Sequence, residues 1–206
     1  MKNIAEKLAE YGVASLSECE LLAQVARVSL DQAREAITSA GGLRSLLTST
    51  TGTHGLTTLQ FSTLHAALEL TRRHYHELMK HSSPLSNPRA TREYLRMKLR
   101  DLPYEVFCCL YLDNRHRVIH FSELFRGTID GASVHPREVV KDALARNAAA
   151  VILCHNHPSG VAEPSHADEV ITQRLKSALA LVDIRLLDHL IVGDGVCESF
   201  AERGLL

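Results

Sequence analysis

The spacing of apolar residues divides the chain into two parts. From Ile4 to about His81, apolar positions recur every three to four residues, which predicts a series of helices. Ser17 is a candidate helix N-cap, and Gly41-Gly42 predicts a helix end. The Ser- and Pro-rich stretch KHSSPLSNPRA follows. We therefore expect a small helical domain over residues 1–80 and a linker over residues 81–90.

Residues 91–206 have a mixed pattern. After one more helical segment, ATREYLRMKLRDL, the runs EVFCCLYLD and RVIHFSELFRG predict an antiparallel hairpin. HPREVVKDALARNAA predicts a helix with proline in its first turn, and AVILCH predicts a short buried strand. A helix in SHADEVITQRLKSALALV and a hairpin in IRLLDHLIVGDGVCESF complete the pattern. The sequence thus predicts an α/β fold with a mixed sheet behind a helical domain.

Composition favours a globular protein without a strong electrostatic preference. The chain has 206 residues, 45% of them hydrophobic, and a net charge of -1. This balance gives no general attraction to nucleic acid or to acidic membranes. No apolar run is long enough to cross a bilayer, and five scattered cysteines form no C-x-x-C pair. We expect a cytoplasmic protein that does not contact membranes.

The segment CHNHPSGVAEPSHAD carries the candidate chemistry. Because alternate residues of a strand share a face, His155 and His157 leave the strand together, while Cys154 and Asn156 face the other way. Asp168 lies one turn inside the next helix. Two imidazoles and a carboxylate suit Zn²⁺ and leave one position open for a water of lowered pKa. Such an open site is typical of a hydrolase.

A purely structural interpretation also exists for part of this segment. Ser165 and Asp168 have the spacing of a capping box, which needs no metal. No structural reason asks for both His155 and His157, so together they favour a ligand set. A second H-x-H, at residues 74–76, is expected on a helix, where the two rings point about 200° apart and cannot share an ion.

Other patterns account for the histidines less well. A binuclear H-x-H-x-D-H site needs an acid where Ser159 stands, and a cupin site needs a glutamate closer than Glu163. His166 is expected to face solvent. His189 is open to two interpretations, either a side chain that supports a ligand from behind or an ordinary core histidine.

The four-residue pattern H-x-H-x7-S-x2-D resembles the JAMM motif of the JAB/MPN metalloproteases. The flanking segments LFRGTIDGASVHPREVVKDALARNAAAVILCHNHPSG and LLDHLIVGDG resemble the RadC-like (UPF0758) branch, historically labelled DNA repair proteins. The resemblance implies a JAB/MPN domain of cytidine-deaminase-like fold over residues 91–206. It also implies hydrolysis of a peptide or isopeptide bond, but it names no substrate.

The resemblance further implies a role for each matching residue. His155, His157 and Asp168 would bind zinc, and Ser165 would donate a hydrogen bond to the oxyanion of the reaction. JAMM enzymes also use a glutamate on the first core strand as general base. We expect this residue to be Glu105, with Glu123 as the alternative.

The helical domain leaves a second class of function open. THGLTTLQFSTLHAALELTRR resembles the second half of a helix-hairpin-helix, but Thr57 stands where the second glycine belongs after Gly55. Residues 1–80 contain eight Lys and Arg against eight Asp and Glu, without the basic excess of a DNA-binding face. A packing or interaction domain is therefore favoured. The alternative to a hydrolase is a nucleic-acid-binding or protein-interaction module with a structural metal.

Overall fold

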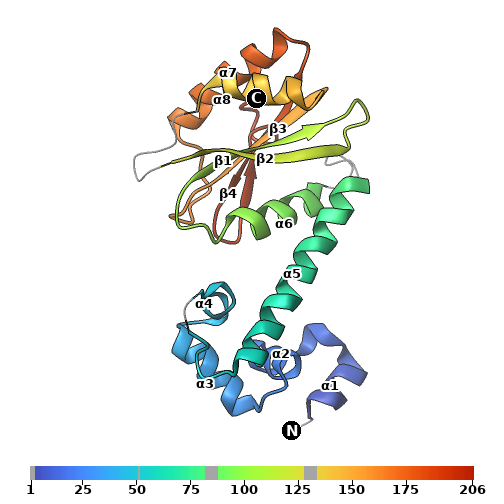
Figure 1. The fold of residues 1–206 in the computed structure, drawn as a ribbon, viewed down its shortest axis with the longest axis vertical. Coiled ribbons are helices and arrows are strands. Elements are labelled where there is room, and N and C mark those ends of the chain that lie inside the picture. The colour runs from blue at the N-terminus through green and yellow to red at the C-terminus, as the bar shows by residue number, and fades with distance from the viewer. Residues whose placement is uncertain (1–2, 51, 82–87, 128–133) are drawn as a thin grey trace. The chain divides into compact units, whose positions relative to one another are not determined.

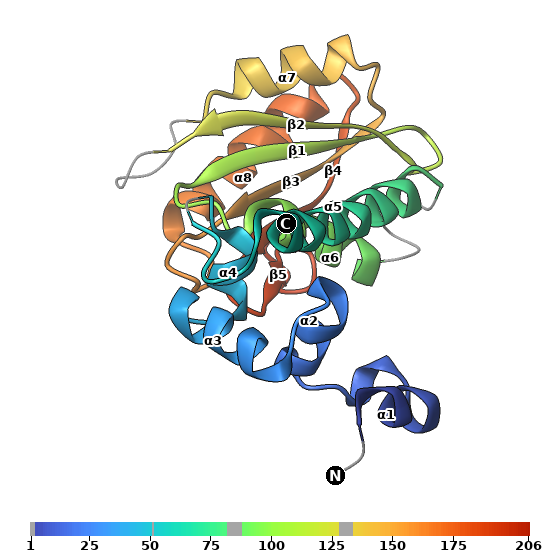
Figure 2. The ribbon, with the colours of Figure 1, turned by 60° about the horizontal axis from the view of Figure 1, so that its bottom comes forward.

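A computed structural model describes residues 3–50, 52–81, 88–127 and 134–206. Contacts between Cα atoms divide the chain into two compact units, Met1–Arg73 and His74–Leu206 (Figures 1 and 2). Helix α5, Thr58–His81, begins in the first unit and ends in the second. None of the described helices combines the length and the apolar character needed to cross a bilayer.

The first unit consists of short helices around a small apolar core. Leu22, Ala33, Leu46 and Leu64 are buried together in this core. The helices before α5 are α1 (Ile4–Tyr11), the 3-10 turn η1 (Val13–Ser15), α2 (Glu18–Ala26), α3 (Leu30–Ala40) and α4 (Leu43–Thr48).

The capping residues of the first unit follow the sequence signals. Ser17 caps α2 in a reciprocal capping box with Glu20, and Gly41 ends α3 in the left-handed conformation with φ of 79°. Thr57 caps α5 in the same reciprocal way. Its hydroxyl accepts from Gln60 N at 3.3 Å, and its own N–H donates to Gln60 Oε1 at 2.9 Å. Thr57 therefore uses side-chain contacts at the helix start where a helix-hairpin-helix presents amides to phosphate.

The expected linker, residues 81–90, is described only at its two ends. His81 is the last residue of α5, and Pro88 begins α6, Pro88–Leu99. Proline is tolerated in the first turn of a helix because the N–H that it lacks has no partner there. Residues 88–90 are therefore helical, and residues 82–87 of the expected linker lie outside the described residues.

The second unit is built on a mixed five-stranded sheet, as predicted. Its strands are β1 (Val106–Leu112), β2 (Val118–Arg126), β3 (Ala150–Asn156), β4 (Arg185–Val192) and β5 (Cys197–Ser199), in the order β2-β1-β3-β4-β5. Among the described strands, β3 and β4 alone pair in parallel, and α8, His166–Ala180, connects them. The two predicted hairpins are the antiparallel pairs β1–β2 and β4–β5.

Helices cover both faces of this sheet (Figure 1). On one face, Cys108 and Cys154 pack with Leu95 and Leu99 of α6. On the other face, Phe107 and other residues of β1 and β3 pack with α8 and with α7, Pro136–Ala145. Because both faces are covered, every residue of β1 and of β3 is buried. His155 therefore lies at the end of the central strand, and His157 directly follows it.

Candidate metal centre

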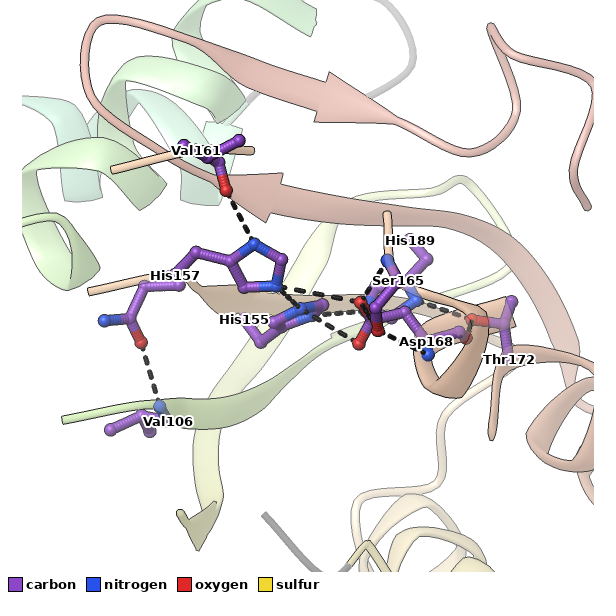
Figure 3. Close-up of polar contacts among 9 residues, drawn as sticks. Val106, His155, His157, Val161, Ser165, Asp168, Thr172 and His189 are labelled. Carbon is purple, nitrogen blue, oxygen red and sulfur yellow. Dashed lines mark hydrogen bonds and ion pairs between the residues drawn. The ribbon is translucent and has the colours of Figure 1, made fainter. Parts of the chain in front are cut away.

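The end of strand β3 carries the two histidines. His155 is fully buried, and its ring stacks on that of Phe107 with 6.1 Å between the ring centroids. His157 follows the strand and stays extended because its N–H donates to Val192 O at 3.0 Å. The rings converge, with 2.9 Å between the two Nε2 atoms (Figure 3). The extended backbone thus brings both rings to one face of the sheet.

The first turn of α8 supplies the carboxylate. Ser165 is the N-cap, and Asp168 is the third helical residue of a reciprocal capping box. Asp168 Oδ1 lies 3.2 Å from His155 Nε2, and Oδ2 lies 3.7 Å from His157 Nε2 (Figure 3). One donor atom from each of the three residues lies within 4.8 Å of the other two. The structure therefore brings His155, His157 and Asp168 together as a possible metal-binding triad.

A loop fixes the proton of His157. Its Nδ1 lies 2.7 Å from Val161 O, and a carbonyl can only accept, so Nδ1 carries the hydrogen. Nε2 of the neutral ring then presents a lone pair to the triad. The loop packs tightly on Gly193, where an added Cβ would lie 2.5 Å from Gly160 O. A side chain at position 193 would push this loop, and with it the Val161 carbonyl, away from His157.

The charges of the triad are strongly coupled. Burial opposes ionisation of Asp168, but the contacts with the rings of His155 and His157 outweigh it and hold the pKa of this carboxyl well below its usual value. The hydrogen bond with Asp168 in turn raises the pKa of His157. Three lone-pair donors that face one point repel one another unless a proton or a cation lies between them. The donor set thus suits a bound cation.

Glu105 lies close to His157. It directly precedes β1, in which Phe107 pairs with His155 at the end of β3. Glu105 and His157 both line a cleft of about 580 Å³, together with Pro103, Tyr104, Gly127, Pro158 and Ser159. A carboxylate and a candidate metal ligand therefore share one opening to solvent.

Comparison with known proteins identifies the family of this chain. The family model described as the RadC-like JAB domain matches residues 85–205. The chain belongs to the RadC-like (UPF0758) family. It is 59% identical to a UPF0758 protein of Nitrosococcus oceani, 58% to one of Thioalkalivibrio sulfidiphilus and 52% to one of Azotobacter vinelandii. Each of these alignments covers 98% of this chain and 94% of the relative.

In this RadC-like domain, Glu123 lies away from the histidines. It pairs with Cys108 across β1 and β2, and directly opposed residues share a face of the sheet. Cys108 packs on the α6 side, whereas His155 lies against Phe107 on the α7 and α8 side. Glu123 is exposed, and its carboxylate lies 3.9 Å from the guanidinium of Arg126. The structure thus groups Glu105, and not Glu123, with the triad.

The contacts of Asn156 were not predicted from the sequence. Its side chain is buried, accepts a hydrogen bond from Val106 N at 2.8 Å, and donates one to Tyr104 O at 3.0 Å. These two backbone groups flank Glu105. The main chain of Glu105 is held from the other side, where its carbonyl accepts from Gly127 N at 2.8 Å. The residue between the two histidines therefore fixes the backbone that carries the glutamate.

Two further polar residues behind the triad form a chain of contacts. His189 Nε2 lies 2.8 Å from His155 Nδ1, and Thr172 Oγ1 lies 2.6 Å from His189 Nδ1 (Figure 3). Burial lowers the pKa of His189 well below its usual value. From the sequence, His189 had two possible interpretations, and Thr172 was not identified as part of the site. A threonine one helical turn after Asp168 was the available signal. Cys154 and His166 lie as expected, on the opposite face and in solvent, respectively.

Proposed function

We propose that this RadC-like chain is a zinc-dependent hydrolase that cleaves peptide or isopeptide bonds. The observation that carries the proposal is the convergence of two imidazole nitrogens and one carboxylate beside a cleft that a second carboxylate, Glu105, also lines. Catalytic zinc sites characteristically use three protein ligands of this kind and keep one position open.

The spacing of the donor atoms supports zinc. Zinc binds nitrogen and oxygen ligands at about 2.0–2.2 Å, so two ligand atoms of a tetrahedral site lie about 3.3 Å apart. The distances of 2.9, 3.2 and 3.7 Å within the triad lie around this value. In the neutral ring, His157 carries its hydrogen on Nδ1 and offers the lone pair of Nε2 to this point. A structural zinc site normally has four protein ligands, whereas the cluster found in the described residues has three.

Glu105 is proposed as the general base. Bound zinc supplies a Lewis acid and lowers the pKa of water to about 7. Glu105 would accept the proton of the attacking water and then deliver it to the leaving amine. The fixed main chain around Glu105 favours this role, because a general base must be held within hydrogen-bond reach of the proton that it removes.

Ser165 has a role in the helix cap and a second, proposed role in the reaction. Its hydroxyl donates to Asp168 Oδ2 at 2.5 Å and accepts from Asp168 N at 3.2 Å. These contacts fix the orientation of the carboxylate that would bind zinc. We propose that the same hydroxyl turns to the oxyanion of the reaction, as the resemblance to JAMM enzymes implies.

The choice of bond follows from the family resemblance rather than from a contact in the cleft. JAMM enzymes cleave peptide and isopeptide bonds, so a protein or peptide is the proposed substrate class. The cytoplasm is the proposed location, because all five cysteines are free thiols and a reducing compartment keeps them so.

The deciding experiment compares Glu105→Gln with the wild-type protein. The full chain would be purified without a metal-affinity column, and its zinc content would be measured by mass spectrometry. New amino termini would then be counted after incubation with a peptide library. We expect one zinc per chain in both proteins. Hydrolysis should fall by about 10²–10⁴-fold in Glu105→Gln, because the variant keeps the ligands and loses the base.

Glu123→Gln is the matched control, since it makes the same change on the opposite face of the sheet. It should hydrolyse like the wild-type protein. Loss of activity in Glu123→Gln with full activity in Glu105→Gln would reverse the assignment. If the wild-type protein and both variants retained zinc and none of them hydrolysed peptides, the result would favour the alternative, a binding module with a structural metal. A wild-type protein that binds no zinc would rule out both.

A further inference from the structure

Thr172 has only one hydroxyl proton, and the structure fixes its direction. Thr172 Oγ1 lies 2.5 Å from Asp168 O, one helical turn earlier in α8. A carbonyl oxygen has no proton to give, so the threonine hydroxyl donates to it. Toward its second neighbour, His189 Nδ1 at 2.6 Å, the hydroxyl can then only accept. Nδ1 of His189 therefore carries a hydrogen.

The surroundings of His189 favour a neutral ring. The side chain is fully buried, and the rings of Phe107 and Phe200 pack against it with centroid distances of 5.6 and 4.7 Å. Its two ring nitrogens contact Thr172 and His155, and no carboxylate oxygen of the described residues contacts either of them. A charged imidazolium in such a site would lose its hydration without gaining an anion. With Nδ1 protonated, His189 Nε2 is then an acceptor.

The same hydrogen-bond argument applies to the candidate ligand His155. His155 Nδ1 lies 2.8 Å from His189 Nε2 and must donate to it. His155 therefore carries its hydrogen on Nδ1, and its Nε2, which faces Asp168 and His157, keeps a free lone pair. The tautomer of a histidine ligand is set by the hydrogen bond that its other nitrogen makes.

We propose that Thr172 and His189 are positioning residues that hold the proton of His155 on Nδ1 and so keep Nε2 free to bind the metal. The inference rests on the proposed function for its consequence, since the free nitrogen matters only if a cation binds there. In this proposal, α8 contributes the hydroxyl of Thr172 to the site as well as Asp168. The Asp168 carbonyl starts the hydrogen-bond chain, and the Asp168 carboxylate meets the ring at its other end.

The two histidine ligands are thus prepared in different ways. His157 donates to a backbone carbonyl, which cannot change its role, so its tautomer depends on the loop alone. His155 donates to another imidazole, which could give or accept a proton. Its tautomer therefore depends on a side chain in the next turn of α8, and the Thr172 hydroxyl becomes the group that decides it.

The test reads the tautomers directly in the metal-free full chain. Proton–nitrogen NMR of imidazole-labelled protein, at a pH where the rings are neutral, should show His155 and His189 both protonated on Nδ1. Thr172→Val has nearly the same shape but offers no acceptor to His189 Nδ1. In this variant we expect His189 to move its proton to Nε2 and His155 to move its proton to the ligand nitrogen.

Zinc titration measures the consequence. Loss of such an outer contact typically costs 10–100-fold in metal affinity, and we expect a loss of this size in Thr172→Val. Thr172→Ser keeps the hydroxyl and should restore the tautomers and most of the affinity. Thr71→Val is the matched control, because Thr71 also donates to the carbonyl four residues earlier, at 3.0 Å, but on the exposed face of α5. It should change neither reading.

Two results would overturn the inference. One is His155 protonated on Nε2 in the wild-type protein, which needs no variant to be seen. The other is Thr172→Val with wild-type tautomers and wild-type zinc affinity. Failure of the proposed function would give a different result. The wild-type protein would have both rings protonated on Nδ1 but no affinity for zinc, so the hydrogen-bond chain would be present without a metal to bind.

Discussion

Asn156 links two parts of the site that lie far apart in the sequence. The histidines on either side of it face the triad, and its own side chain pairs with Val106 N and Tyr104 O, at 2.8 and 3.0 Å. A strand backbone normally makes such contacts. Here a side chain makes them, so the segment that carries Glu105 is attached to the strand that carries the ligands. The distance between base and metal would depend on this attachment.

Asn156→Asp tests this link with little change in size. The new carboxylate still accepts from Val106 N but cannot donate to Tyr104 O, and an unpaired buried polar group costs about 1–3 kcal/mol. We expect zinc content to stay at one per chain while hydrolysis falls on the order of 10²-fold, the effect of a misplacement of about 1 Å. Zinc analysis and turnover on the same sample separate the two effects.

Asn114→Asp is the control, because Asn114 is exposed in the turn between β1 and β2. It should behave like the wild-type protein in both measurements. Equal turnover in Asn156→Asp and Asn114→Asp would show that the side chain of Asn156 does not position the base.

The roles of residues that follow from local sequence spacing could be predicted. The roles that depend on contacts between residues far apart in the sequence could not. His155, His157 and Asp168 share one short segment, so strand and helix periodicity was enough to place them together. Asn156 pairs with Tyr104, 52 residues away, and His189 contacts Thr172, 17 residues away. Strand pairing creates those contacts, and the register of a sheet cannot be read from one sequence.

At the scale of elements, the fold was predictable wherever local signals agreed. Both faces of β1 and β3 are covered, which explains their unbroken apolar runs, and the residues that begin α2 and α8 have capping-box spacing. Of the expected linker over residues 81–90, the part from Pro88 onward begins helix α6, and residues 82–87 lie outside the described residues.

The capping box of α2 also connects two helices. The Glu20 carboxylate accepts from Lys7 Nζ of α1 at 2.6 Å, from Ser17 N at 2.9 Å and from Ser17 Oγ at 2.8 Å. The contact with Lys7, followed by those with Ser17, lowers the pKa of Glu20 from 4.5 to about 2. A lowered pKa in the folded state stabilises the protein above pH 4.5, and this stabilisation is lost as the pH falls toward 2.

Glu20→Gln should therefore weaken the first unit at pH 7 and have little effect near pH 2. The amide resonances of α2, followed in urea over this pH range, measure the free energy of unfolding of that unit. Glu35→Gln, on the exposed side of α3, is the control and should leave the pH dependence unchanged. A constant difference between Glu20→Gln and the wild-type protein from pH 7 to pH 2 would contradict the assigned contacts.

At the scale of the whole molecule, the chain contains two units with separate cores. Leu22, Ala36 and Leu46 belong to the core of the first unit, whereas Leu153 and Leu175 belong to the core of the second. The triad lies entirely in the second unit, on β3, on the residue after it and on α8. The proposed zinc would therefore connect two elements of one unit and none of the other.

Zinc binding should stabilise the second unit and leave the first unit unchanged. A ligand at 100 times its dissociation constant stabilises the folded state by about 2.7 kcal/mol. Hydrogen exchange with and without a chelator should show a loss of protection of about this size at Leu153 and Leu175 when zinc is removed, and no change at Ala36 and Leu46. His155→Ala should abolish the difference. Equal loss of protection in both cores would mean instead that the two units unfold together. Helix α5, which begins in the first unit and ends in the second, would then transmit the stability of the metal site to the helical unit.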